Sequence, residues 1–266
     1  MRRLGLAFAL LAALLGGAES ARADMFRPSK DEQVQLGQRA AGELRKKEKV
    51  LPENDPHVVL LRRVAARILK QLPEADLKPW KFSFDVIDSK EVNAFALPGG
   101  PVFFYTGLLK KLGTEDQVAA VLSHEITHAI RQHWASAYAD NQKRKLGLTA
   151  LLMIFRADRA AFDVAGVADD LLFTLPYSRK HETEADMVGY DLMTAAGFNP
   201  QGMVDVFEIL RKATSGGKPP EFLSTHPDDA ARIRRIQDRI KKDSRTFQPQ
   251  VPLPWEAEEI KPKAGK

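Results

Sequence analysis

The chain of 266 residues contains no cysteine, so it has neither a disulfide bond nor a cysteine for lipid attachment. This absence is compatible with export, because a chain of this length can bury a substantial core without covalent cross-links. The sequence also lacks an apolar run of the ~20 residues that a membrane-spanning helix needs, an evident internal repeat and a long low-complexity tract. These absences favour one globular domain of ordinary composition.

A large excess of charge of one sign is absent as well. The formal net charge is +5, and it falls to +3 without residues 1–23, which hold three arginines and one glutamate. Nucleic-acid binding needs clustered positive charge, and so mild a bias gives no reason to expect it.

Residues 1–23 have the pattern of a cleavable leader. Arg2 and Arg3 form a positive start, Leu4–Leu15 an apolar centre, and Ala21–Ala23 a cleavage pattern of small residues. We therefore expect a signal peptide over 1–23 and a mature protein in a bacterial periplasm. Peripheral association of the mature protein with a membrane is left open. The twin arginine also occurs in signals for the export of folded proteins, but the residues around it match such a signal poorly.

His124, Glu125 and His128 form an H-E-x-x-H motif in a stretch whose apolar residues recur at helical spacing. On a helix, the two histidines lie on one face one turn apart, where both imidazoles can reach one metal ion. Glu125 follows the first histidine and can take a proton from a metal-bound water. The motif is typical of zinc-dependent proteases, and the alternative is a chance match on a solvated helix face.

The third metal ligand must come from another part of the chain. Arg131 and Trp134 occupy the glycine and histidine positions of the metzincin extension, which is therefore absent. The inverted H-x-x-E-H order is absent too. His133 is one residue out of register, and we expect it to pack or to support a ligand rather than to bind metal. The His₂Glu class of site remains.

Three carboxylates downstream are candidates for that ligand. Glu182 and Asp186 are one helical turn apart, so one can bind metal while the other accepts the free N–H of a ligand histidine. Glu184 would lie about 200° round the helix from Glu182, although spacing alone does not exclude it. A solvated charged face is the alternative interpretation of this run.

Four stretches together resemble the zinc metalloproteases related to the CAAX prenyl protease, HtpX, Oma-type and BepA/LoiP-type enzymes. They are Asn93–Gly100, His124–His128, Glu182–Asp186, and Ser224–Pro227 followed by Arg232. The similarity runs from about Ser29 to about Ile240, nearly the whole mature chain.

The resemblance implies one Zn²⁺ ion per chain, bound by His124, His128 and Glu182. It also implies that Glu125 is the catalytic base and that Asp186 supports a ligand histidine. These are the positions that the spacing indicates, except that spacing leaves Glu184 open.

The resemblance further implies groups that bind substrate. An edge strand would bind peptide through its backbone, with a plain hairpin as the alternative; its residues are Asn93, Ala94, Phe95, Ala96 and Leu97. His226 and Arg232 are candidates for stabilising the oxyanion of the reaction. In BepA-like relatives the histidine at the position of His226 can instead occupy the fourth zinc position and keep the enzyme latent.

Secondary-structure signals predict an α+β fold, a mostly helical zincin-like (gluzincin) metalloprotease domain with a small antiparallel or mixed sheet beside the active-site helix. The expected strands are Lys81–Ile87, Asn93–Leu97 and Pro101–Thr106. The expected helices are Ser29–Lys47, Asp55–Leu72, a metal helix with a capping box of Thr114 and Gln117, a helix through Glu182 that stops at Ala196–Gly197, Asn199–Ala213 and Pro227–Lys242. The domain is expected over 24–245, with 246–266 as a flexible C-terminal tail.

The apolar run Leu146–Phe155 is too short to span a bilayer as a helix. We expect a buried helix, with a lid or a membrane-surface contact as the alternative.

Together these features predict a zinc metalloendopeptidase that hydrolyses exported proteins, with unfolded or misassembled polypeptides as substrates, in periplasmic or outer-membrane quality control. The alternative is a non-proteolytic, chaperone-like binding protein on the same scaffold. No helical-repeat region follows the domain, which makes a partner-docking role doubtful. A purely structural zinc site is disfavoured by Glu125 and by the fourth position that three ligands leave open.

Overall fold

A small mixed sheet lies beside the helix that carries the H-E-x-x-H motif. The computed structural model describes residues 26–154, 177–214, 219–227 and 230–255, with the backbone alone from residue 146 to 154. The sheet has the strand order β1 (Ser83–Ile87), β3 (Pro101–Tyr105), β2 (Ala94–Ala96). Strand β3 is parallel to β1 and antiparallel to β2. The prediction of a small mixed sheet is therefore confirmed.

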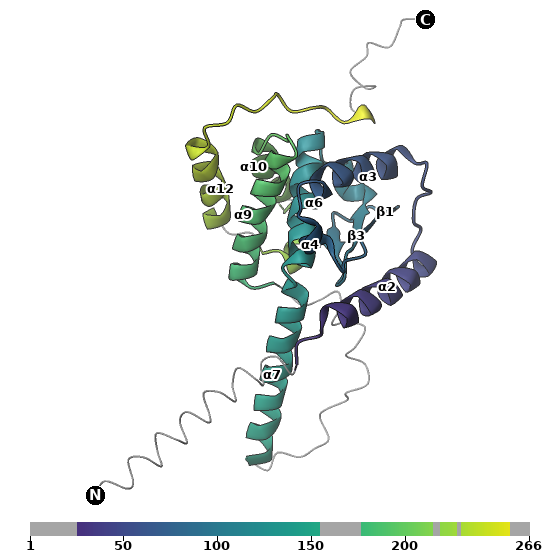
Figure 1. The fold of residues 1–266 in the computed structure, drawn as a ribbon, viewed down its shortest axis with the longest axis vertical. Helices are drawn as coiled ribbons and strands as arrows, with labels where there is room; N and C mark the ends of the chain where they lie inside the picture. The colour runs from purple at the N-terminus through teal and green to yellow at the C-terminus, as the bar shows by residue number, and fades with distance from the viewer. Residues whose placement is uncertain (1–25, 155–176, 215–218, 228–229, 256–266) are drawn as a thin grey trace, which may run out of the picture.

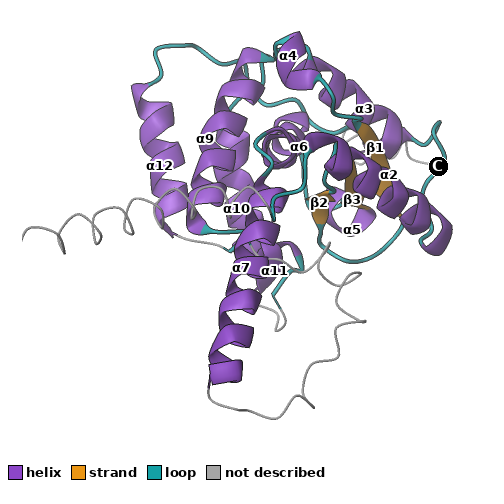
Figure 2. Cartoon of the chain, turned by 60° about the horizontal axis from the view of Figure 1, so that its bottom comes forward, coloured by secondary structure: helices purple, strands orange, loops and turns teal. Residues whose placement is uncertain are grey.

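Alternating residues of β3 pack against helices on both faces of the sheet. Val102 and Phe104 belong to the main core, which α3 (Pro56–Leu69) and α6 (Glu115–Ile130) share. Phe103, between them, packs with Ala41 of α2 (Lys30–Lys47) on the other face. The period of two along a strand thus builds three layers, with the sheet between α2 and the pair α3 and α6 (Figure 2).

Helix α6 lies at the centre of the molecule and is surrounded by other elements. It contacts β2 and α3 on one side, and α9 (Arg179–Ala195) and α10 (Gln201–Thr214) on the other. Helix α12 (Ala230–Lys242) packs outside α9 and α10 (Figure 1). Every residue of α6 from 115 to 129 is buried. A polar motif on this helix is therefore isolated from solvent and needs partners from its neighbours.

The remaining helices are short, apart from one that leads away from the core. They are α4 (Glu74–Leu77), α5 (Thr106–Leu109), α11 (Phe222–Thr225) and the long α7 (His133–Ile154), which projects downward in Figure 1. Helix α7 includes most of the run Leu146–Phe155, but its side chains there and Phe155 itself lie outside the described residues. Among the residues that the structure describes, no helix is long and apolar enough to span a bilayer.

The predicted helix ends agree closely with the structure because their capping residues act as expected. Ser29 and Glu32 form the complete capping box of α2. Thr114 caps α6 by accepting from the N–H of Gln117, but the Gln117 side chain accepts from Gly113 rather than from Thr114, so the predicted box is incomplete. Helix α9 is followed by Gly197 in the left-handed region, with φ +79°.

Part of the segment predicted as a flexible tail is packed against the domain. Leu253 is fully buried and donates its N–H to Gly113 O, and Val251 O accepts from Glu115 N. Asp116 Oδ2 accepts from Val251 N at 2.9 Å. The expectation of a flexible tail was wrong for these residues, because the N–H of Glu115 and the carboxylate of Asp116 at the start of α6 bind the passing backbone. Residues 256–266 lie outside the described part of the chain.

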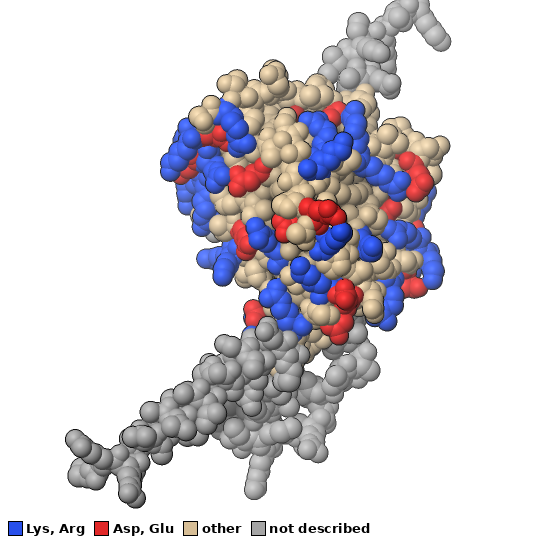
Figure 3. Space-filling model, viewed as in Figure 1, with Lys and Arg blue, Asp and Glu red and all other residues tan. Residues whose placement is uncertain are grey.

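Charge on the surface is mixed, in keeping with the small net charge. Basic and acidic side chains are interspersed over the face shown in Figure 3, and basic ones are most frequent along α12 at its left edge. Arg239 of this helix is paired with Asp191.

Candidate metal centre and active site

Four buried side chains from three helical segments direct their donor atoms at one point. His124 and His128 come from α6, Glu182 from the first turn of α9, and His226 from the C-cap of α11. One ligand atom from each lies within 4.8 Å of the others, and all four residues are buried. Helix α9 is started by its N-cap Ser178, which accepts from His181 N and so fixes the first turn that carries Glu182.

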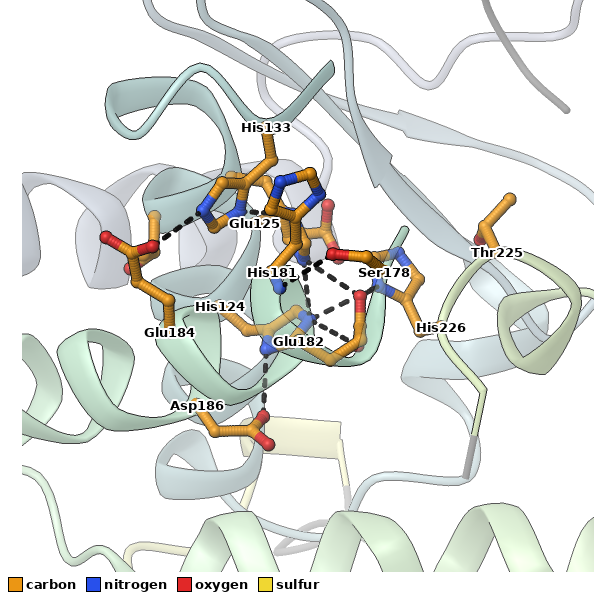
Figure 4. Close-up of polar contacts among 12 residues, drawn as sticks. His124, Glu125, His133, Ser178, His181, Glu182, Glu184, Asp186, Thr225 and His226 are labelled. Carbon is orange, nitrogen blue, oxygen red and sulfur yellow. Dashed lines mark hydrogen bonds and ion pairs between the residues drawn. The ribbon is translucent and has the colours of Figure 1, made fainter. Parts of the chain in front are cut away.

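The distances within this cluster show which atoms converge. His124 Nε2 lies 3.2 Å from His226 Nδ1 (Figure 4). It also lies 3.0 Å from His128 Nε2. Glu182 Oε1 lies 3.4 Å from His128 Nε2 and 3.2 Å from His226 Nδ1. Three ring nitrogens and a carboxylate oxygen with these spacings match the neutral imidazole and carboxylate ligands that zinc accepts.

The charge around the cluster fits a divalent cation. Glu125, Glu182 and Asp186 are three buried carboxylates, and Arg232 is the buried guanidinium beside them. With neutral histidines, as a metal site requires, two negative charges are left over; this is costly away from water, and a divalent ion would neutralise it. Burial disfavours protonation of His124, yet its hydrogen bonds to Asp186 and Glu182 outweigh burial and raise its pKa to about 9. The metal-free site thus attracts positive charge.

Two buried oxygens of the site accept no hydrogen bond from the residues that the structure describes. They are Glu182 Oε2 and Glu125 Oε1. Each faces a basic group without hydrogen-bond geometry, Arg232 Nη1 at 2.7 Å and His226 Nε2 at 3.4 Å respectively. Unsatisfied carboxylate oxygens in a buried polar cluster are what a metal ion and its water would satisfy. The residues present therefore fit a zinc ion.

Asp186 supports His124 from behind the cluster. Its Oδ1 lies 3.2 Å from His124 Nδ1, the ring nitrogen that faces away from the other ligands. A carboxylate in this place fixes the tautomer that leaves Nε2 free for metal. Glu182 and Asp186 thus lie where the two roles that their spacing of four residues allows would require them.

Arg232, on α12, contacts both of these carboxylates. Its Nε and Nη2 each donate to Asp186 at 2.7 Å, and its Nη1 donates to Pro227 O at 3.0 Å. The face of its guanidinium lies 4.9 Å from the centre of the Phe207 ring. The structure therefore places Arg232 behind the cluster, against Glu182 and Asp186, with each of its nitrogens engaged.

Glu125, the residue between the two histidines, points toward the sheet. Its Oε2 accepts from the backbone N–H of Ala96 in β2 at 2.9 Å, and its side chain is fully buried. Burial raises the pKa of Glu125, against the opposing charges of His226 and His124. A carboxylate with a raised pKa beside a metal site is suited to exchange protons near neutral pH.

The predicted substrate strand is adjacent to this carboxylate. Strand β2 covers Ala94–Ala96 of the predicted Asn93–Leu97. The backbones of Asn93 and Leu97 pair with β3, through Tyr105 N to Asn93 O and Leu97 N to Pro101 O. Backbone groups alternate in direction along a strand, so those of Ala94 and Ala96 face away from β3.

Two residues near the cluster received no ligand role from the sequence. The Tyr177 ring stacks on the His128 ring, with centroids 3.9 Å apart, and its N–H donates to Thr225 O beside His226. Burial and the charges of Glu125 and Glu182 raise the pKa of Tyr177. The one signal in the sequence is its position directly before the N-cap Ser178.

The second such residue is His133, the histidine that is out of register. It is buried, and its Nδ1 lies 2.9 Å from His128 Nδ1. Burial and the neighbouring His181 lower its pKa to about 4. Burial and the charge of His124 also lower the pKa of His128 well below its ordinary value, so both imidazoles are neutral.

A buried cluster of this kind on a mostly helical domain with a small mixed sheet defines the zincin-like class of metallopeptidases. The model of peptidase family M48 matches residues 60–240. The chain belongs to this family, which confirms the resemblance on which the sequence interpretation depends.

Curated relatives carry metalloendopeptidase and protease names. The chain is similar to mitochondrial metalloendopeptidase OMA1 of Schizosaccharomyces pombe, with 36% identity over 72% of the chain and 55% of the relative. It is also similar to the beta-barrel assembly-enhancing protease of Escherichia coli K12, with 29% identity over 71% of the chain and 40% of the relative. The chain therefore spans about half or less of the length of these relatives.

Proposed function

We propose that the chain is a zinc-dependent endopeptidase. The observation that carries this proposal is the convergence of His124, His128 and Glu182 on one point, with the buried carboxylate of Glu125 between that point and the edge of the sheet. The first three residues would bind a zinc ion, and Glu125 would be the proton acceptor beside it, as hydrolysis of a peptide bond requires. Membership of a peptidase family and the names of the relatives support the same activity.

Zinc at this site would supply a Lewis acid and lower the pKa of a water molecule to about 7. Glu125 would accept a proton from the attacking water and pass it to the leaving amine. The raised pKa of Glu125 suits both halves of this transfer, because the carboxyl can hold the proton between them. The hydrogen bond from Ala96 N leaves Oε1 as the oxygen that takes the proton.

Substrate would bind along β2 as an added strand. The outward backbone groups of Ala94 and Ala96 supply donors and acceptors that recognise a peptide irrespective of its side chains. The N–H of Ala96 is engaged by Glu125, so the substrate would use the other outward backbone groups, those of Ala94 and the carbonyl of Ala96. A peptide bound there would place its scissile carbonyl next to the catalytic carboxylate.

His226 has two roles in this proposal. Its Nδ1 stands at the fourth corner of the cluster, where it would bind zinc and keep the site closed. Displaced from that corner, its ring would remain close enough to donate to the oxyanion of the substrate. The contacts of Arg232 favour support of Glu182 and Asp186 over direct donation to the oxyanion.

The place of action and the substrates are inferred from the leader pattern of residues 1–23 and from the relatives. A cleavable signal peptide would bring the enzyme to the periplasm, where unfolded or misassembled exported proteins would be cleaved. The name of the Escherichia coli relative, a beta-barrel assembly-enhancing protease, suggests quality control of outer-membrane proteins. The mitochondrial name of the OMA1 relatives points to a different compartment for those proteins.

Cleavage of casein by the purified mature chain, with and without a chelator, tests the activity. Glu125→Gln should bind zinc as the wild type does and lose proteolysis by at least about 100-fold. A non-proteolytic binding protein would instead suppress aggregation of an unfolded protein equally well in both forms. Wild-type cleavage rates in the Glu125→Gln variant would show the assignment of the base to be wrong.

A further inference from the structure

We propose that His133 and Glu184 form a positioning relay for His128, which rests on the metal site proposed above. His128 Nδ1 lies 2.9 Å from His133 Nδ1. His133 Nε2 lies 3.4 Å from Glu184 Oε2, and Figure 4 shows these two side chains facing each other. The relay orients the second metal ligand and connects the buried site to the surface. Neither the motif nor the spacing of the sequence assigns a role to Glu184.

The positions of the protons fix the donor and the acceptor of each hydrogen bond in the relay. A His128 that offers Nε2 to a metal ion carries its proton on Nδ1. His133 Nδ1 must then accept this proton's hydrogen bond, so a neutral His133 carries its own proton on Nε2. That N–H points at the carboxylate of Glu184, which accepts it. A metal ion bound to His128 Nε2 therefore sets the tautomer of His128 and, through the hydrogen bond, that of His133.

The contact between His128 and His133 depends on the break between α6 and α7. In a continuous helix, His128 and His133 would be five residues and about 140° apart, and their side chains would diverge. Helix α6 ends at Ile130, and Gln132 adopts φ +55°, a left-handed conformation that costs a non-glycine residue about 1 kcal/mol or more. Gln33 Nε2 holds this turn by donating to Gln132 Oε1 at 3.1 Å. The turn returns His133 to the side of His128.

The two α6 ligands are thus held by different means. The partner of His124 is the buried carboxylate of Asp186, with 2% of its side chain exposed. The partner of His128 is a neutral imidazole, and the charge that completes this chain is Glu184, with 39% of its side chain exposed. Arg131 Nε lies 3.3 Å from Glu184 Oε1 and restrains it from the surface side. The three α9 carboxylates therefore act at different places. Glu182 faces the metal position, Asp186 supports His124 Nδ1, and Glu184 supports His133 Nε2.

The test measures zinc affinity of the mature chain by competition with a chromophoric chelator. His133→Phe keeps the ring shape and removes the acceptor, and it should weaken zinc binding by about 10–100-fold. His133→Gln offers an amide oxygen to His128 and should recover most of that loss. Glu184→Gln should weaken binding less than His133→Phe does. His57→Gln and Glu43→Gln, which are matched changes away from the metal site, should bind zinc as the wild type does.

Nitrogen-15 spectra of the zinc-loaded histidine side chains give a readout that a purely structural role would not change. In the wild type the proton on His128 Nδ1 should be shifted downfield by its hydrogen bond to His133 Nδ1, and His133→Phe should remove that shift. If His133→Phe does not fold, the His133 Nε2 proton should still shift in Glu184→Gln. Unchanged spectra, or zinc affinity of His133→Phe within threefold of the wild type, would overturn the relay. A wild type that binds no zinc would instead overturn the proposed function.

Discussion

Replacing Arg232 by methionine removes the positive charge behind the metal ligands. Arg232 is 4% exposed and contacts two carboxylates that are each 2% exposed. It makes two hydrogen bonds of 2.7 Å to Asp186 and an ion pair of 2.7 Å with Glu182. Methionine fills similar space against Phe207 but leaves both carboxylates without this partner.

The cost follows from the burial of the charges that remain. Breaking a buried ion pair on one side typically costs about 3–5 kcal/mol, because the other charge stays buried and uncompensated. For a domain of this size, each kcal/mol shifts the melting temperature by roughly 2–4 °C, so Arg232→Met should melt about 6–20 °C below the wild type. The loss should be larger in chelator, since zinc neutralises part of the excess negative charge.

Calorimetry of the variant and the wild type, with zinc and with chelator, measures the decrease in melting temperature under each condition. Arg239→Met is the matched control on the same helix, because Arg239 is 44% exposed and pairs with the exposed Asp191. That change should cost less than about 1 kcal/mol.

One result would refute this reasoning. If Arg232→Met lowered kcat and left both the melting temperature and zinc affinity unchanged, Arg232 would act on the reacting groups instead. Its candidacy for the oxyanion, which the resemblance implied, would then be preferred over the supporting role that its contacts favour.

Two further predictions concern His124 and its packing. In chelated protein, the pKa of His124 is raised above its unfolded value of about 6.5 to about 9, so its contribution to stability is full below pH 6.5 and is lost as the pH rises through 9. Urea unfolding should show a decrease of up to about 3 kcal/mol over that range, and a flat profile would contradict it. Gly189→Val should destabilise the fold by about 1–3 kcal/mol and weaken zinc binding, since even a Cβ at Gly189 would lie 3.2 Å from His124 N; an unchanged zinc affinity would show that α9 yields without moving the ligand.

The elements that the sequence predicted well are those with a local physical signal. The N-caps Ser29 and Thr114 each accept from a backbone N–H as their residue type requires. The i, i+4 spacing of His124 and His128 needs only the helix between them. The ends of β2 were less well predicted, because pairing with β3 decides which of Asn93–Leu97 belong to the strand.

The parts that the sequence did not predict depend on contacts between distant segments. His133 reaches His128 only because the chain turns at Gln132, and the conformation of Gln132 is supported by Gln33, 99 residues away. Leu253 is buried in the main core and donates its N–H to Gly113 O, 140 residues earlier in the chain. A local pattern does not contain such information, since each contact joins residues far apart in the chain.

The assignment of the three α9 carboxylates shows how packing decides what spacing leaves open. Glu182, Glu184 and Asp186 are on one helix, and their spacing says which of them share a face but not which face meets α6. Gly189 decides this, because the absence of a side chain there lets α9 approach to within van der Waals distance of the His124 backbone. With α9 fixed at that crossing, Glu182 faces the ring nitrogens that converge, Asp186 faces the back of His124, and Glu184 reaches past the end of α6 to His133. The glycine at the helix crossing therefore determines the ligand set as much as the carboxylates do.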